Sequence, residues 1–355
     1  MFSKITIGKG QSKYDVIIGE GLCTKANFQK FVTKDQKILL LRDRNIPGKK
    51  IATIKKNLKS LGAKVYDYEI PPGEKSKSFN NFEKIHNFLS TNAFLRSDAI
   101  LACGGGVVGD LAGFVASTYM RGINYIQIPT SLLAQVDSSV GGKTAINLKS
   151  GKNLVGAFYN PKGVLIDTEF LESLGEREFK SGLAEIIKHA LIDNRSFAKY
   201  LLKYSKEILN RDSGHLNKII TRSIKIKAKI VTKDEKEQGI RAFLNFGHTV
   251  GHALEHYFGS KLMHGEAVAY GMAYEAKMSL EMLKLKKDDF QLIQELLEKF
   301  EFNKQLKVSF NELKPFIKID KKNTSNLVNL VQLKAIGECK IVAIKNINSL
   351  KKFFN

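Results

Sequence analysis

The pattern of predicted secondary structure changes near Asp167, and this change limits the possible folds more than any other feature of the sequence. Before it, short apolar runs of strand length alternate with segments of helical periodicity. The expected strands are residues 14–18, 37–41, 63–70, 99–103, 125–128 and 164–166, and helices are expected at residues 48–61 and 76–91. Strands and helices that alternate through short connections form a mainly parallel sheet with helices on both faces.

After Asp167 apolar residues recur every three to four positions, which is typical of helices that pack together. Helices are expected at residues 176–209, 214–236, 244–258, 265–283 and 287–300, and a small hairpin at 327–333 and 340–344. We therefore predict an α/β domain with a mainly parallel sheet over residues 1–170. An all-α domain over residues 171–355, with the hairpin against it, is predicted to follow, and the site is expected in the cleft between them.

The 355-residue chain is strongly basic: it contains 57 Lys and Arg residues and 35 Asp and Glu residues, which gives a net charge of +22. Such an excess suits a nucleic-acid partner or an anionic substrate. The lysines are scattered, however, with no arginine-rich block and no basic stripe interleaved with aromatic residues. We interpret the charge as a solvated surface and predict no nucleic-acid partner.

Cysteine use and hydropathy predict the compartment. Cys23, Cys103 and Cys339 are far apart and form no CxxC pair, which suits a reducing cytosol. The N-terminus carries charges where a signal peptide has its apolar core. No span reaches the roughly 20 apolar residues of a membrane helix. The sequence therefore predicts a cytoplasmic protein with no membrane partner.

Residues 245–271 contain four of the seven histidines: His248, His252, His256 and His264. The first three are four residues apart, so in a helix they share one face. Imidazole is the commonest transition-metal ligand, so the cluster predicts a divalent metal between two consecutive helices. The alternative is a set of core or helix-end histidines that only satisfy hydrogen bonds. Spacing does not decide which of the four bind metal.

Two glycine-rich segments predict phosphate binding. Gly104, Gly105 and Gly106 follow an expected strand and open a helix, where backbone N–H groups can approach a diphosphate. This is not the GxGxxG fingerprint, and a tight turn is the alternative. Residues 129–153 then repeat Gly-Lys pairs and hydroxyls, predicted on loops, which suits a phosphorylated polyhydroxylated substrate. Residues 142–144 resemble the end of a P-loop, but the upstream glycine spacing excludes a Walker motif.

Seven motifs together resemble the 3-dehydroquinate synthase family, in the order found there, over residues 43–322. They are GGGVVGDLAGFVAST, YMRG, IPTSLLAQVDSSVGGKTAIN, GKNLVGAFYNP, SGLAEIIKHALI, LNFGHTVGHALE and LMHGEAVAYGM. The resemblance implies that the α/β domain is nucleotide-binding and the all-α domain metal-binding. It implies a homodimer that binds NAD+ and a divalent metal, most often Zn²⁺, with Co²⁺ as an alternative. It also implies conversion of 3-deoxy-D-arabino-heptulosonate 7-phosphate to 3-dehydroquinate and phosphate in the shikimate pathway, which supplies aromatic amino acids. The implied steps are transient oxidation by NAD+, phosphate elimination, re-reduction and intramolecular aldol closure.

The resemblance also implies a metal site and a proton-handling residue. It assigns the metal to Glu185, His248 and His264, with an open coordination position for substrate oxygens. His252 becomes a proton-handling or orienting neighbour, and His256 lies outside the site. Spacing alone favours His248 with His252 as paired ligands, an interpretation that the resemblance replaces.

The remaining roles are carried over motif by motif, against the alternative that each isolated lysine belongs to the solvated surface. The cofactor side takes Asp43, Glu74, Lys77, Gly105, Gly106, Asp110, Thr130, Ser131, Asp137, Lys143 and Lys152. The substrate side takes Lys143, Lys152, Asn153, Lys188, Lys227, Arg241, Asn245, His252 and Lys322, with Arg121 from a partner subunit. Arg241 and Lys227 are expected to clamp a carboxylate. The group formed by Lys143, Asn153, Lys322 and Arg121 is expected to hold the phosphate. Ser131 stands where the family usually has threonine, which keeps the hydroxyl.

Related enzymes remain as alternatives: another sugar-phosphate cyclase such as 2-deoxy-scyllo-inosose synthase, or a metal-dependent polyol dehydrogenase. The segment VGGKTAIN and the pair Arg241 and Lys227 favour the dehydroquinate enzyme, because a substrate without a carboxylate gives this arginine nothing to bind. A basic nucleic-acid-binding protein with the same fold has only the net charge in its favour.

Overall fold

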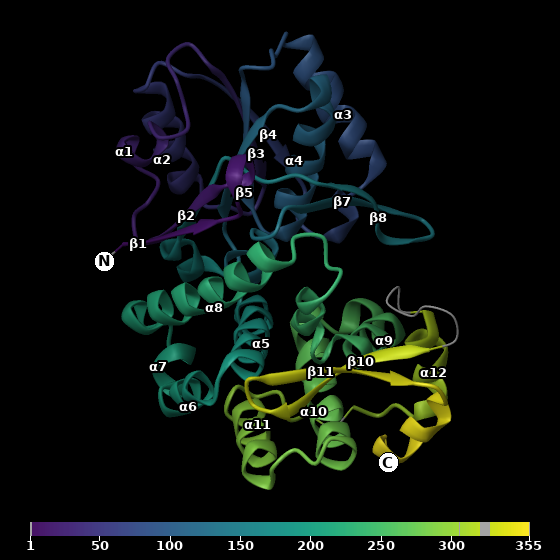
Figure 1. Ribbon diagram of the computed structural model, residues 1–355. Helices are drawn as coiled ribbons and strands as arrows, with labels where there is room; N and C mark the ends of the chain where they lie inside the picture. Colours follow the sequence, from purple (N-terminus) through teal and green to yellow (C-terminus); the bar gives the residue numbers. More distant parts are fainter. Residues whose placement is uncertain (1, 305, 320–326, 355) are drawn as a thin grey trace. The chain divides into compact units, whose positions relative to one another are not determined.

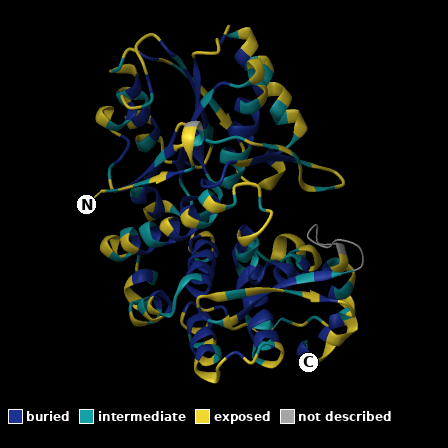
Figure 2. Ribbon diagram, in the orientation of Figure 1, coloured by how far each residue is buried: buried dark blue, intermediate teal, exposed yellow. Residues whose placement is uncertain are grey.

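The computed structural model describes residues 2–304, 306–319 and 327–354, and the chain divides into two compact units, Met1–Gly175 and Glu176–Asn355 (Figure 1). Each unit contains its own hydrophobic core, which Figure 2 shows as buried ribbon along the strands of the first and the helices of the second. All three cysteines are free thiols.

A seven-stranded sheet with the order β1-β2-β9-β6-β5-β3-β4 forms the centre of the first unit. Its strands are β1 (Ser3–Ile7), β2 (Tyr14–Gly19), β3 (Lys37–Asp43), β4 (Lys64–Ile70), β5 (Ala99–Gly104), β6 (Asn124–Pro129) and β9 (Gly163–Asp167). β1 is antiparallel to β2, and every other pairing in this sheet is parallel. The predicted mainly parallel sheet is confirmed, with β1 as an addition that the sequence pattern did not indicate.

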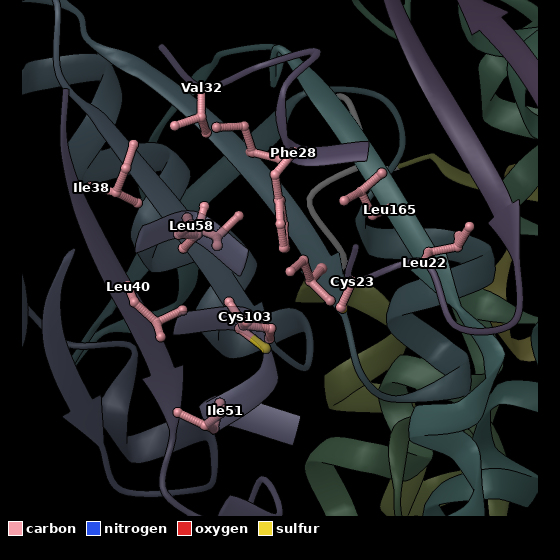
Figure 3. Close-up of a cluster of buried hydrophobic side chains, with 14 of the residues drawn as sticks. Leu22, Cys23, Phe28, Val32, Ile38, Leu40, Ile51, Leu58, Cys103 and Leu165 are labelled. Carbon is pink, nitrogen blue, oxygen red and sulfur yellow. The ribbon is translucent and has the colours of Figure 1, made fainter. Parts of the chain in front are cut away.

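Both faces of the sheet are covered, which explains why its strands are continuous apolar runs. Ile38 and Leu40 of β3 point to one face, in a core cluster with residues of α1 (Lys25–Phe28) and α2 (Gly48–Lys59) (Figure 3). Leu39 and Leu41 point to the other, where α3 (Phe79–Thr91) and α4 (Gly106–Thr118) pack. Period-two alternation is hidden in sequence because both sets of side chains are apolar.

The order of the strands reverses between β3 and β5. From β3 the chain adds β4 at the sheet edge, then returns to place β5 and β6 on the other side of β3. Such a reversal opens a crevice at the carboxyl ends of the two strands. Those ends are Asp43 and Gly104, so the topology brings the expected adenosine-binding aspartate and the glycine turn to one edge.

Residues 143–158 form a hairpin and not the predicted loops. β7 (Lys143–Leu148) pairs antiparallel with β8 (Gly151–Phe158), with Lys143 opposite Phe158. The glycines and lysines of this segment are typical of loops. Thr144, Ala145 and Ile146 are nevertheless buried, and β7 packs on α4, where Ile146 enters the core. Tertiary burial therefore outweighs the loop-like composition.

Helices dominate the second unit, as predicted, and one small hairpin accompanies them. The helices are α5 (Glu176–Asp193), α6 (Arg195–Lys203), α7 (Ser205–Leu209), α8 (Ser213–Lys233), α9 (His248–Phe258), α10 (His264–Met282), α11 (Lys287–Lys299) and α12 (Phe310–Ile319). The hairpin consists of β10 (Val328–Ala335) and β11 (Glu338–Ile344), so the unit is not strictly all-α. The single helix expected over residues 176–209 is three, because Asn194 caps a new start by accepting the Phe197 N–H at 3.0 Å. Among the described residues, no helix has the length and apolar character needed to cross a bilayer.

Glycines bring α9 and α10 into close antiparallel contact. A Cβ on Gly271 would lie 1.9 Å from the Gly247 carbonyl oxygen, and one on Gly251 would lie 3.0 Å from the Ala267 carbonyl oxygen. No larger residue fits where the two backbones approach so closely. This packing sets the relative positions of His248 and His264, the first residues of the two helices.

Candidate active site

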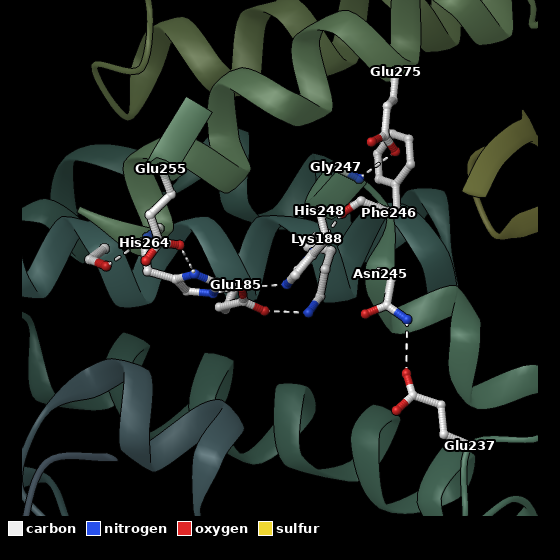
Figure 4. A network of polar contacts seen from close by, with 12 residues as sticks. Glu185, Lys188, Glu237, Asn245, Phe246, Gly247, His248, Glu255, His264 and Glu275 are labelled. Carbon is white, nitrogen blue, oxygen red and sulfur yellow. Dashed lines mark hydrogen bonds and ion pairs between the residues drawn. The ribbon is translucent and has the colours of Figure 1, made fainter. Parts of the chain in front are cut away.

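Three potential metal ligands from three helices converge in the second unit (Figure 4). Glu185 comes from α5, His248 from the start of α9 and His264 from the start of α10. The Glu185 Oε1 atom lies 3.5 Å from His248 Nε2 and 3.6 Å from His264 Nε2. The structure therefore brings together the donor atoms of the carboxylate and two imidazoles that the resemblance implies, a group that does not include His252.

The spacing of these donor atoms fits a tetrahedral metal ion. Ligand bonds of about 2.0–2.2 Å at tetrahedral angles place the donor atoms roughly 3.3–3.6 Å apart. The observed separations of 3.5 and 3.6 Å match this value and exceed an ordinary hydrogen bond. The residues present therefore fit a divalent ion.

The outward-facing nitrogen of each histidine contacts an oxygen. His248 Nδ1 lies 3.2 Å from the Phe246 carbonyl oxygen, and His264 Nδ1 lies 3.1 Å from Glu255 Oε2. A carbonyl and a carboxylate only accept, so each Nδ1 carries a hydrogen and, in the neutral ring, Nε2 presents its lone pair to the centre. Metal-ligating histidines are held in this way by carbonyl or carboxylate partners.

Glu185 is fully buried, and its two oxygens have different surroundings. Oε2 accepts a hydrogen bond from Lys188 Nζ, one turn along α5. Oε1, which faces the histidines, has no hydrogen-bond partner among the described residues. A buried carboxylate oxygen without a partner is costly, and a bound cation would remove that cost.

In the absence of metal, a proton on His264 supplies the missing positive charge. Burial lowers the pKa of His264, but Glu185 and Glu255 outweigh burial and raise it to about 10. Burial raises the pKa of Glu185, but Lys188 and His264 outweigh it and hold that pKa well below its usual range. The site is therefore built for a carboxylate that faces a cation, either a proton on the imidazole or a metal ion.

The other two histidines of the cluster differ in position. The ring of His252 lies 5.4 Å from that of His248 and 6.1 Å from that of His264, measured between centroids. This placement suits the predicted neighbouring role. His256 is exposed, and its ring stacks on Phe316 with an interplanar angle of 2°.

The second unit also buries the cations expected to bind substrate. Lys188 (α5), Lys227 (α8) and Arg241 are buried, with exposed fractions of 1%, 5% and 3%. Arg241 lies in the turn Ile240–Asn245, which packs on α8, and its guanidinium donates to the Glu235 carbonyl. Buried lysines and arginines are rare in proteins and need a partner or a function. Asn245 Nδ2 donates to Glu237 Oε1 at 2.9 Å, whereas the predicted phosphate ligand Lys322 lies outside the described residues.

In the first unit the glycine turn forms an open helix N-terminus. Gly105 is the N-cap of α4, and no side chain among the described residues caps it. A Cβ on Gly105 would lie 3.4 Å from Ser131 Oγ, and one on Gly106 would lie 3.0 Å from Ser138 Oγ. Thr130 joins this turn through its N–H, which donates to the Gly104 carbonyl at 3.0 Å. Backbone without side chains at Gly105 and Gly106, the hydroxyls beside it and the positive end of a helix fit the diphosphate of a dinucleotide.

A second group of predicted residues forms a polar network beside α4. Lys77 Nζ, which is buried, contacts both the Asp110 carboxylate and Asn153 Oδ1. Asn147 connects this network further: its Nδ2 donates to Glu74 at 2.7 Å, and its Oδ1 accepts from the Asn153 N–H at 2.9 Å. The sequence interpretation missed Asn147, although it ends the VGGKTAIN motif. Burial raises the pKa of Asp110, while the Lys77 ammonium opposes that rise.

The remaining predicted residues of the first unit are spread over several elements. Asp43 ends β3 and accepts the Asn45 N–H at 2.8 Å, and Asp137 lies in the helical turn Ala134–Ser138. Lys143 and Lys152 are exposed on the β7–β8 hairpin. Arg121 is exposed beyond the end of α4 with a φ of 65°, and its expected contact with a partner subunit stays a prediction.

Gly106→Ala is expected to weaken NAD+ binding by about 10-fold or more, because the added methyl group fills the space near Ser138 that a diphosphate needs. The fold should be kept if the Ser138 hydroxyl, 3.0 Å from the new Cβ, rotates away, since alanine favours helix over glycine; thermal unfolding checks this. Gly48→Ala is the matched control: Gly48 also begins a helix, but its Cβ would meet nothing within 4 Å. Fluorescence titration with NADH measures the dinucleotide affinity of both variants. Equal affinities for the two variants would exclude this turn as the dinucleotide site.

Comparison with solved structures defines the class of fold. It is shared with a 2-deoxy-scyllo-inosose synthase solved with carbaglucose-6-phosphate, NAD+ and Co²⁺ (TM-score 0.89, 24% identity, 99% of this chain and 100% of that chain). It is also shared with the 2-epi-5-epi-valiolone synthase of Streptomyces hygroscopicus subsp. jinggangensis, solved with NAD+ and Zn²⁺ (TM-score 0.88, 22% identity, 99% and 98%). An iron-containing alcohol dehydrogenase matches at a TM-score of 0.70, with 14% identity and 100% and 98% of the two chains covered.

Sequence relatives are more specific. Residues 67–181 match the family 3-dehydroquinate synthase N-terminal, and residues 182–323 match 3-dehydroquinate synthase C-terminal. The 3-dehydroquinate synthase of Clostridium beijerinckii is 42% identical over 94% of this chain and 96% of its own length. That of Thermodesulfovibrio yellowstonii is 41% identical over 99% of both. The chain belongs to the 3-dehydroquinate synthase family and is an enzyme of the sugar-phosphate cyclase type.

Proposed function

We propose that this protein is a 3-dehydroquinate synthase, which converts 3-deoxy-D-arabino-heptulosonate 7-phosphate to 3-dehydroquinate and phosphate. Family membership across both units carries this proposal, because the family match includes the carboxylate, the two imidazoles and the glycine turn. We further propose that the enzyme is a phosphate-eliminating lyase that depends on NAD+ and a divalent metal, with zinc as the first candidate.

When bound, a divalent ion on Glu185, His248 and His264 would supply Lewis acidity, and NAD+ would accept and return a hydride. The chain's own groups bind and orient the substrate around them. Lys188 holds the buried Glu185 carboxylate in its charged form. His252 lies close enough to the two histidines to hold or move a proton of a substrate hydroxyl there.

Charged side chains would hold the two anionic ends of the substrate. We assign its carboxylate to Arg241 and Lys227, because a buried guanidinium binds a carboxylate through two parallel hydrogen bonds. We assign its phosphate to Lys143, Asn153 and Lys322, with Arg121 from a second copy of the chain; Lys322 lies outside the described residues. A cytoplasmic homodimer is part of this proposal, and sedimentation equilibrium tests the dimer.

Arg241→Lys is expected to lower kcat/KM for the heptulosonate substrate about 10- to 100-fold, because an ammonium cannot replace the planar fork of a guanidinium. The main effect should fall on KM if the arginine binds the carboxylate equally in ground and transition states. Arg44→Lys, at an exposed arginine paired with Glu69, is the control. An unchanged KM for Arg241→Lys would remove this residue from the carboxylate site.

An assay of phosphate release distinguishes this activity from those of the related cyclases and polyol dehydrogenases. The metal-loaded protein with NAD+ should release phosphate from 3-deoxy-D-arabino-heptulosonate 7-phosphate and form 3-dehydroquinate, detected by its absorbance after dehydration. If it left that substrate unchanged but turned over glucose 6-phosphate or glycerol, the proposal would fail in favour of another cyclase or a polyol dehydrogenase.

A further inference from the structure

The helix that begins at His248 lacks the usual cap at its N-terminus. α9 starts at His248, and its N-cap residue is Gly247, which has no side chain to accept the first N–H groups. These groups need acceptors when they are buried. The end of α9 that carries a proposed metal ligand must therefore be satisfied from elsewhere.

Packing against α10 explains why a capping side chain is excluded at this position. Gly247 has a φ of 81°, and a Cβ there would lie 2.5 Å from Met272 Cγ and 2.8 Å from the Val268 carbonyl oxygen. Serine, threonine or aspartate would clash at this point and strain the backbone. The close approach of α9 and α10 is incompatible with an ordinary N-cap.

Glu275 of α10 supplies the missing acceptors (Figure 4). Its Oε2 accepts the Gly247 N–H at 2.7 Å, and its Oε1 accepts the Val250 N–H at 3.3 Å. These are the N-cap and N3 groups that a capping box satisfies with two side chains of its own helix. Here one fully buried carboxylate from a neighbouring helix binds both.

The two N–H groups flank His248 in sequence, so the Glu275 carboxylate fixes the backbone on both sides of that residue. The Phe246 carbonyl, which lies 3.2 Å from His248 Nδ1, belongs to the peptide unit whose N–H is bound by Glu275. One carboxylate thus holds both the Cα of His248 and the oxygen that orients its ring. The second imidazole, His264, comes from the same helix as Glu275.

We propose that Glu275 is a positioning residue of the metal centre: by capping α9 from α10, it holds His248 at the separation from Glu185 and His264 that the ion requires. It does not touch the ion, and acts through the backbone of residues 246–250. This inference rests on the proposed metal site. It predicts that Glu275 affects metal affinity and coordination geometry, beyond its contribution to folding.

Glu275→Gln tests the proposal in the full-length protein. The amide keeps one acceptor but turns its NH₂ group toward the other backbone N–H, so one of the two bonds is lost. Zinc affinity, measured by chelator competition, is expected to fall about 10- to 100-fold, the range for groups that orient metal ligands. The visible absorption spectrum of the Co²⁺-loaded protein should also change, because the position of His248 changes. Glu275→Asp keeps the charge but shortens the side chain by one methylene group, and it should lower zinc affinity in the same way. This variant replaces Glu275→Gln in the test if the glutamine variant does not fold.

Two controls separate positioning from stability. Glu281→Gln alters an exposed carboxylate on the same helix that pairs with Lys352, and should leave zinc affinity and the Co²⁺ spectrum unchanged. Met278→Ala removes a buried side chain of α10 and should lower the melting temperature, yet keep zinc affinity within about 2-fold.

A Glu275 variant that melts earlier but retains wild-type zinc affinity and the wild-type Co²⁺ spectrum would overturn the proposal and leave a purely structural cap. The proposal is likewise overturned if Met278→Ala weakens zinc binding as much as Glu275→Gln does. Failure of the wild-type protein to bind zinc or cobalt would instead refute the proposed metal site itself.

Discussion

Replacing Glu185 by glutamine is expected to abolish phosphate release and to weaken zinc binding by about 100-fold or more. This effect exceeds the one expected when a residue that only orients a metal ligand is lost. A neutral amide oxygen is a poor ligand, and its NH₂ group would face either Lys188 or the two imidazoles. The substitution also leaves the buried Lys188 ammonium without its carboxylate. Breaking a buried ion pair by removing one partner costs roughly 3–5 kcal/mol, so the melting temperature should fall as well.

Metal content by atomic absorption, phosphate release and thermal unfolding measure these effects together. Glu178→Gln is the matched control, because it alters an exposed carboxylate on the same helix. If Glu185→Gln kept one zinc per chain and wild-type phosphate release, the assignment of the metal to this carboxylate would be wrong.

Zinc affinity is expected to rise steeply with pH, by roughly tenfold per pH unit and about 100-fold from pH 6.5 to 8.5. In the metal-free protein the pKa of His264 is raised to about 10, so the metal must displace a proton throughout this range. Because the pKa of His264 in the folded protein lies above the ordinary 6.5, protonation of His264 stabilises the metal-free fold. This stabilisation is fully present below pH 6.5 and is lost as the pH rises through about 10.

Isothermal titration of zinc into the metal-free protein, in buffers with different ionisation enthalpies, counts the protons released. We expect about one proton per zinc at pH 7–8 from His264. Glu255→Gln should reduce this number at pH 8 and flatten the pH dependence, because one of the two carboxylates that raise the pKa of His264 is gone. Zinc affinity that stays constant from pH 6.5 to 8.5 would show that zinc displaces no proton from His264.

The parallel strands of the large sheet and most helices could be predicted because their signals are local. Leu39 to Leu41 form a continuous apolar run since both faces of the sheet are covered, and α9 and α10 keep a periodicity of three to four residues. The β7–β8 hairpin was missed because its glycines and lysines resemble a loop, whereas Ile146 is held by the core.

The candidate site was less accessible to sequence reasoning. The spacing of the histidines points to His248 and His252 as a pair, and only the family resemblance suggests Glu185, which lies on a different helix. Asn147 and Glu255 end two of the quoted motifs but received no role, and Glu275 lies outside all of them. In sequence, a carboxylate that orients a ligand cannot be distinguished from one that faces solvent.

The sequence alone determined the α/β character of the first unit, the helical character of the second and the residue types available for a metal and a dinucleotide. The tertiary structure decided which of these side chains meet. Gly247, Gly251 and Gly271 allow α9 and α10 to approach closely, and that approach sets the positions of His248 and His264 relative to Glu185. Burial periodicity is a property of neighbouring residues in the chain, whereas metal ligation depends on atoms from distant segments that only packing brings within reach.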